Sequence, residues 1–161
     1  MIYHFRSFYF EVKKEMPTLS GRDGLYPSND REVHEMVMEW LDKLRSREDD
    51  LAILVEGKKD KAALILLGIP HPIIELNRGM NIFDRIEISK LQELSTPFKG
   101  TFVILTDWDR KGGMLATRAK KACLHLGVRI DMDVRKDISS IIGKWVKDVE
   151  SIPAFLSHLD V

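Results

Sequence analysis

Carboxylates follow two short apolar runs of this 161-residue chain. Glu56 comes after the run 51–55, and Asp107 and Asp109 come after the run 101–106. Residues i and i+2 of an extended chain project to the same side, so Asp107 and Asp109 can share one space while Trp108 points away and packs. Three such anions repel each other at low dielectric unless a hard divalent cation neutralises them. Mg²⁺ fits best, because it takes one or two carboxylates, keeps waters and leaves positions for phosphate.

Glycines and basic residues surround these acids. Gly57 lets the backbone turn sharply, and Gly112 with Gly113 lets a phosphate approach the start of the next helix. The segment 110–121 holds five basic groups and no acidic one. The positions predicted to bind phosphate or nucleic acid are Lys58, Lys59, Arg110, Lys111, Gly112 and Gly113. Positive charge around a carboxylate-bound metal suits a phosphodiester, whose flanking phosphates need holding.

Five further residues are secondary candidates, each with a plainer alternative. Asp60 opens a helix four residues after Glu56, and it either contacts the metal site from outside or is a carboxylate that interacts with the helix dipole or is solvated. Asn77 and Arg78 either touch a phosphate or form a plain turn. Asp131 and Asp133 repeat the Asp-x-Asp spacing near a fourth strand, where alternation on an exposed edge strand is the default explanation.

The elements that position these residues alternate between strand and helix from residue 51 onward. The predicted strands are 51–55, 72–76, 101–106 and 128–132, and the helices between them end at Gly68, within 82–94 and at Gly127. This spacing favours βαβ units and a parallel sheet covered on both faces. Parallel sheets bind ligands beyond the carboxyl ends of their strands, where Glu56 and Asp107 fall.

An amphipathic helix is predicted before the first strand, at residues 29–46. Asn29 and Glu32 have capping-box spacing, and an apolar stripe follows with helical periodicity. Its members are Val33, Met36, Val37, Trp40, Leu41 and Leu44. Such a stripe is typical of a core-facing surface.

The composition limits the class of protein. The chain is 44% hydrophobic and 31% charged with a formal net charge of zero, which favours one compact soluble domain over a disordered chain or a general nucleic-acid coat. No apolar run reaches the roughly 18 residues of a membrane span, and no signal peptide is recognised, so the cytoplasm is the expected compartment. The single cysteine, Cys123, lies on the apolar face of a predicted helix, and the five histidines have no zinc spacing. No P-loop and no GxGxxG motif occurs.

Two segments, ILVEGKKDKAAL and FVILTDWDRKGG, carry a resemblance to a known family. In order and in their separation of roughly 50 residues they resemble the Toprim domain of bacterial-type DNA primases, topoisomerases and ribonuclease M5-like nucleases. With the later segment GKWVKDVESI, the chain resembles a family of small archaeal Toprim proteins whose role is unassigned. The resemblance covers about residues 50–135.

The resemblance implies roles for three residues. Glu56 would be a general acid or base, and Asp107 and Asp109 would bind one or two Mg²⁺ ions, for which Mn²⁺ can substitute. Whether Glu56 ligates the metal or moves a proton stays open. A topoisomerase needs a tyrosine-bearing domain, whereas the tyrosines of this chain all precede residue 29. A primase needs additional domains.

These observations predict a compact, Rossmann-like α/β fold with a parallel sheet of about four strands, the Toprim fold. Residues 1–50 form an N-terminal extension of a loop and a helix, 51–135 the core, and 136–161 a C-terminal helical segment packed on it. The expected function is Mg²⁺-dependent phosphodiester chemistry on RNA or DNA, as in a small nuclease. The alternatives are a non-catalytic binding module within a larger assembly, and a vestigial site whose N-terminal helix docks a partner or a second copy.

Overall fold

The computed structural model describes residues 29–94 and 98–159. The predicted N-terminal loop and the tyrosines at positions 3, 9 and 26 lie outside these residues. The elements in chain order are α2 (Asp30–Arg45), β1 (Leu51–Val55), α3 (Lys58–Leu66), β2 (Ile73–Glu75), α4 (Ile82–Gln92), β3 (Thr101–Ile104), α5 (Arg110–His125), β4 (Arg129–Asp131), α6 (Asp133–Ile142) and α7 (Ile152–His158).

The four strands form one parallel sheet in the order β2-β1-β3-β4, which confirms the predicted α/β fold class. The predicted strands are found at the predicted places, although β2, β3 and β4 are shorter than the apolar runs. Strand β1 is buried along its whole length, as a central parallel strand covered on both faces should be.

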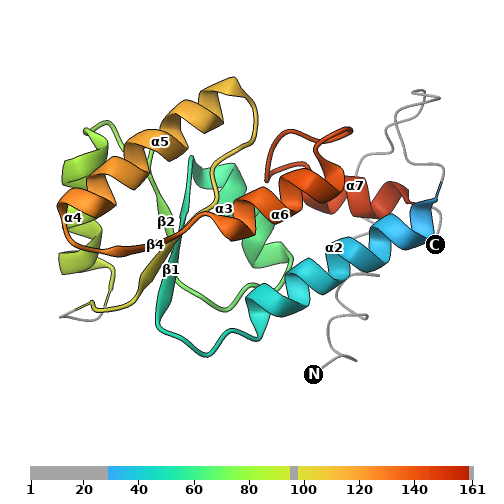
Figure 1. The fold of residues 1–161 in the computed structure, drawn as a ribbon, viewed down its shortest axis with the longest axis horizontal. Helices are drawn as coiled ribbons and strands as arrows, with labels where there is room; N and C mark the ends of the chain where they lie inside the picture. The colour runs from blue at the N-terminus through green and yellow to red at the C-terminus, as the bar shows by residue number, and fades with distance from the viewer. Residues whose placement is uncertain (1–28, 95–97, 160–161) are drawn as a thin grey trace.

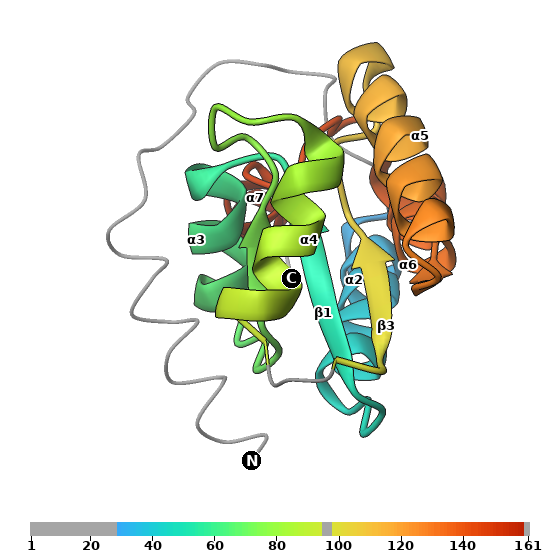
Figure 2. The same cartoon turned by 90° about the vertical axis from the view of Figure 1, so that its left-hand side faces the viewer.

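The molecule has three layers, with α4 and α5 on one face of the sheet and α2, α3, α6 and α7 on the other (Figures 1 and 2). Alternate residues of β1 supply the two cores. Ile53 and Val55 point into the core on the α2 side, and Ala52 and Leu54 point into the core on the α5 side. Cys123 is fully buried in the α5-side core, as predicted for a small hydrophobe, and burial raises the pKa of its thiol to about 12.

The chain order places a topological switch point between β1 and β3. From β1 the chain crosses to β2 at one edge, then returns past β1 to β3. The helices that follow β1 and β3 lie on opposite faces of the sheet, since α3 packs in the α2-side core and α5 in the other core. Loops that diverge in this way leave a crevice at the carboxyl ends of the two strands.

Helix α2 confirms the predicted amphipathic helix and its cap. The Asn29 side chain accepts a hydrogen bond from the Glu32 amide at 3.3 Å and donates to the Glu32 carboxylate at 2.8 Å. The prediction of a buried Met36 was wrong, because this side chain is 43% exposed. It lies at the margin of the stripe, where α6 does not cover it.

The rest of the α2 stripe belongs to the main core and is covered within the chain. Trp40 donates from Nε1 to the Val134 carbonyl of α6 at 2.9 Å, and Val37 and Leu41 are fully buried. The apolar face of α2 is therefore mostly covered within the chain. No helix among residues 29–94 and 98–159 has the length and apolar character needed to cross a bilayer.

Candidate functional site

The ends of β1 and β3 bring the predicted acids to the switch point. The two strands are paired from Leu51↔Thr101 to Leu54↔Ile104, and the Leu105 amide donates to the Leu54 carbonyl at 2.8 Å. Glu56 leaves β1 directly beside the segment that carries Asp107 and Asp109. The carboxylates are close enough for Asp109 to raise the pKa of Glu56 and for Glu56 to raise the pKa of Asp107, after larger contributions from burial. We call Glu56, Asp107 and Asp109, together with Asp60, the acidic cluster.

The loop between β3 and α5 is fixed by Asp109 and Gly112. The Asp109 carboxylate caps α5 by accepting from the Gly112 amide at 2.7 Å, and the Thr106 hydroxyl donates to the Gly112 carbonyl at 2.8 Å. A Cβ atom on Gly112 would lie 1.9 Å from the Asp107 carbonyl oxygen. Gly112 is buried, and its lack of a side chain allows this close packing of the backbone. A Cβ atom on Gly113 would meet only Arg135 Nη2, at 3.8 Å, so this position is less crowded.

A C-terminal segment, residues 146–150, packs along this loop. The Trp108 amide donates to the Lys147 carbonyl at 2.9 Å, and the Trp108 indole donates to the Val146 carbonyl. Trp108 is partly buried against the α2-side core, which agrees with the prediction that it points away from the acids and packs. The Val149 amide donates to Asp107 Oδ1 at 3.0 Å.

Two acids of this segment, Asp148 and Glu150, were missed as neighbours of the site. Both raise the pKa of Asp60, and Asp148 also raises that of Asp107, behind the larger effect of burial. They belong to the GKWVKDVESI segment, whose resemblance to small archaeal Toprim proteins was the available signal. Their approach to the acids depends on a chain reversal after α6, which local sequence does not specify.

Of the secondary candidate acids, Asp60 lies at the site, whereas Asp131 and Asp133 lie elsewhere in the fold. Asp60 is only 6% exposed and accepts from the Gly57 amide at 3.1 Å, so it is a carboxylate at the start of α3, as in the plainer alternative, but is buried and not solvated. Its charge also raises the pKa values of Glu56 and Asp107, behind the larger effect of burial. Asp131 pairs with Arg47 at 2.7 Å and accepts from the backbone amides at the start of α6. Asp133 is exposed. The structure therefore assigns Asp131 to the scaffold and leaves both of these acids outside the acidic cluster.

Burial and repulsion from neighbouring acids both raise the pKa values of Glu56, Asp60 and Asp107. The pKa of Asp107 is raised from its ordinary value of 3.8 to about 7, chiefly by burial, although the Val149 amide partly offsets this. Burial also raises the pKa of Glu56 and that of Asp60. Glu56 Oε1 is buried without a hydrogen-bond partner, and an unsatisfied buried carboxylate oxygen calls for a cation or a proton.

Arg135 of α6 supplies a positive charge beside these acids. Its guanidinium donates from Nε to the Thr106 carbonyl at 3.0 Å and from Nη2 to the Asp107 carbonyl at 2.8 Å. Burial lowers its pKa, while Asp107, Asp109 and Glu56 raise it. These contacts tie α6 to the end of β3.

The donor set suits a partly hydrated Mg²⁺ better than a complete carboxylate cage. In the part of the chain that the structure describes, no three His, Cys, Asp or Glu side chains form a ready ligand group. Asp107 and Asp109 each turn one oxygen toward a backbone amide, which leaves each with a second oxygen. Glu56 Oε1 adds a further oxygen without a partner. Mg²⁺ is usually bound through one or two carboxylates plus waters, so these residues fit the ion.

Basic side chains flank the acidic cluster on two helices. Lys58 and Lys59 open α3, and Arg110 and Lys111 open α5; all four are exposed. Lys111 lies near enough to lower the pKa of Glu56 slightly, against the larger effects of burial and of the neighbouring acids. The predicted arrangement of cations around a negative centre is therefore present.

Comparison with known proteins shows where the chain belongs. No family model matches it. A UPF0292 protein of Thermococcus onnurineus is 34% identical over 121 residues, which is 75% of this chain and 84% of that protein. The chain belongs to the UPF0292 family. A UPF0292 protein of Methanosarcina barkeri is 32% identical over 135 residues, which is 81% of this chain and 90% of that one.

The fold of this UPF0292 chain is also found in a solved structure. A protein from Aquifex aeolicus aligns with a TM-score of 0.57 and 25% identity, over 72% of this chain and 97% of that one. The likeness supports the α/β architecture described above.

The raised pKa of Asp107 predicts that this UPF0292 chain gains stability when the charge is removed. A carboxyl whose pKa rises on folding binds its proton more tightly in the folded protein than in the unfolded one. The contribution of Asp107 to the stability of the folded protein is therefore favourable at low pH and is lost as the pH rises through about 7. At pH 8 without divalent cations, Asp107→Asn should therefore raise the melting temperature. Allowing for solvent screening of this half-buried group, we expect about 2–4 °C, or about 1 kcal/mol.

Differential scanning calorimetry with and without Mg²⁺ measures this effect. Asparagine can still accept from the Val149 amide, so the variant removes the charge and keeps the contact. Mg²⁺ should raise the melting temperature of the wild type but not that of the variant. A variant that is less stable at pH 8 would contradict the assignment of Asp107 as a strained acid.

Proposed function

We propose that this protein is a Mg²⁺-dependent phosphodiester enzyme acting on nucleic acid, with a Toprim-type site and a ribonuclease M5-like reaction. One observation carries the proposal: Glu56, Asp107 and Asp109, drawn from two strand ends, meet at the topological switch point, where burial and neighbouring acids raise the pKa values of Glu56 and Asp107. Exposed lysines and arginines flank this centre. Buried acids with strongly raised pKa values in a crevice are typical of functional sites.

Each residue has a role in the proposed reaction. A bound Mg²⁺ would neutralise the phosphate oxygens of the scissile diester. Asp107 and Asp109 hold the ion through the oxygens that do not face backbone amides. Glu56 exchanges a proton with the attacking or leaving hydroxyl, and its raised pKa brings it nearer to the working pH. Lys58, Lys59, Arg110 and Lys111 form the candidate contacts to flanking phosphates.

A non-catalytic binding module within a larger assembly is the second candidate. One observation favours it: four cations, Lys58, Lys59, Arg110 and Lys111, are exposed at the starts of α3 and α5. Such a module needs the exposed cations and does not need a metal held for catalysis. It predicts binding that depends on the cations, without turnover.

One assay separates the two candidates. Purified protein is incubated with structured RNA, single-stranded DNA or duplex DNA in Mg²⁺, Mn²⁺ or EDTA. The enzyme predicts cleavage of at least one substrate that EDTA abolishes and that Asp109→Asn, which keeps an oxygen to cap α5, reduces strongly. Asp137→Asn, an exposed acid of α6, is the matched control. Tight binding without cleavage in either metal would support the module.

A further inference from the structure

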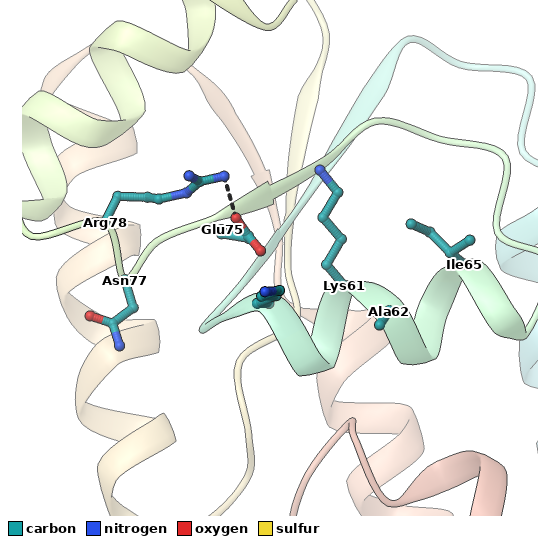
Figure 3. A pocket seen from close by; sticks show the side chains of 7 residues that line it. Lys61, Ala62, Ile65, Glu75, Asn77 and Arg78 are labelled. Carbon is teal, nitrogen blue, oxygen red and sulfur yellow. Dashed lines mark ion pairs between the residues drawn. The ribbon is translucent and has the colours of Figure 1, made fainter.

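A pocket lies beside the acidic cluster, between α3 and the carboxyl end of β2. It is an open pocket of about 570 Å³ (Figure 3). Lys61 and Arg78 reach toward the end of β2 from opposite sides, with Glu75 between them. Lys58 also lines the pocket. Asn77, the remaining secondary candidate, lines it too.

The wall formed by β2 is held firmly. Arg85, which is only 3% exposed, donates from Nε to the Glu75 carbonyl at 2.7 Å and pairs with Glu93. The Glu75 side chain is 9% exposed, and its carboxylate is ion-paired with Arg78 at 2.5 Å. The Glu75 carboxylate and the strand end that carries it are therefore held in place before a ligand binds, which limits the ordering that the ligand must impose.

The charges in the pocket do not balance. Lys58 and Lys61 form no ion pair and no side-chain hydrogen bond with the described residues, whereas Glu75 is matched by Arg78. Three cations and one carboxylate give the pocket a net charge of +2. A phosphate monoester carries a charge near −2 at pH 7, whereas a phosphodiester carries −1. Complementary charge therefore favours the monoester.

The remaining wall is apolar. Ala62 and Ile65 continue the same face of α3 away from the cations, and Ile65 is 57% exposed. An apolar strip beside a cationic end matches a nucleoside attached to its phosphate.

We propose that this pocket binds a terminal phosphate monoester, carried by a nucleotide or by the phosphorylated end of a nucleic acid. Its place supports a link to the acidic cluster, because Glu75 pairs in register with Val55 and the Asn77 amide donates to the Glu56 carbonyl at 2.8 Å. Recognition of a phosphorylated end as part of cleavage rests on the function proposed above. Binding of the monoester does not, because it needs neither the metal nor turnover.

Binding is measured in EDTA by isothermal titration calorimetry, so that a failure of the proposed cleavage cannot affect the result. The probes are adenosine 5′-monophosphate and its methyl phosphodiester, which differ by one charge. We expect the monophosphate to bind about tenfold more tightly than the diester, since charge-assisted hydrogen bonds are strong. Lys61→Gln should remove most of this preference, and Lys120→Gln, an equal charge change on the exposed side of α5, should leave it unchanged.

Short oligonucleotides with a 5′-phosphate or a 5′-hydroxyl identify the source of the monoester. A preference for the 5′-phosphate that Lys61→Gln removes would support a nucleic-acid end, and a preference seen only with the mononucleotide would support a free nucleotide. Equal affinities for monophosphate and diester would overturn the proposal. So would a preference that Lys61→Gln and Lys120→Gln alter equally while both variants melt like the wild type.

Discussion

Glu56→Gln is expected to lower the rate of Mg²⁺-dependent cleavage by about a thousandfold or more, because general acid–base groups contribute about 10²–10⁴ and this residue also lies among the metal-binding candidates. Glutamine has nearly the same shape but cannot exchange the proton. The affinity for substrate should change little, since Lys58, Lys59, Arg110 and Lys111 remain in place. Single-turnover cleavage and fluorescence anisotropy on the same substrate separate the two quantities.

The pH dependence gives this prediction a second readout. Burial raises the pKa of Glu56, and burial raises that of Asp107 to about 7, so both acids keep their protons to higher pH than usual. A protonated carboxyl cannot ligate a cation or accept a proton. Wild-type cleavage should therefore increase as the pH rises through about 7. If Glu56→Gln cleaved at the rate of Asp137→Asn, Glu56 would have no role in the reaction.

Gly112→Ala is expected to destabilise the protein by about 3 kcal/mol or more, the upper part of the range for overpacking a closed site. The added Cβ would lie 1.9 Å from the Asp107 carbonyl oxygen and 2.5 Å from the carbonyl carbon. Neither atom can move without shifting the segment that carries both Asp107 and Asp109. Urea denaturation measures the loss of stability, and Mg²⁺ titration of the folded variant measures the effect on the site.

Gly113→Ala is the matched control for this prediction, because it makes the same substitution one residue further along α5. A Cβ there meets nothing closer than Arg135 Nη2 at 3.8 Å. Alanine is favoured over glycine within a helix by about 0.5–1 kcal/mol, so this variant should be as stable as the wild type or slightly more so. Equal losses in both variants would show that the packing of Gly112 on Asp107 does not cause the loss.

The candidate site combines two parts that sequence reasoning treats differently. Glu56, Asp107 and Asp109 were predicted because they follow apolar runs, and the carboxyl ends of parallel strands share one edge of a sheet. No local pattern in the sequence places Arg135 at the site. Its guanidinium reaches the site only because α6 packs so that Nε and Nη2 meet the carbonyls at the end of β3.

Contacts between distant parts of the chain also explain why the surroundings of Gly112 and Asp131 differ from what their local motifs suggested. Gly112 was predicted to admit a phosphate, since glycine permits close approach of any group, and only the packed loop shows that the Asp107 carbonyl takes that space. Asp131 repeats the Asp-x-Asp spacing, yet Arg47 and the start of α6 bind its carboxylate. A local motif does not specify which partner a polar group will find across the chain.

By itself, the sequence determined the type and order of the elements, the parallel sheet and the position of three acids at its edge, because periodicity and strand ends are local properties of the chain. Tertiary structure alone decided that residues 146–150 would lie against Asp107, that Asp148 would act on Asp107 and Asp60, and that Glu150 would act on Asp60. The pKa of Asp107 depends on burial and on charges that are distant in sequence, so only the folded chain could raise it to about 7.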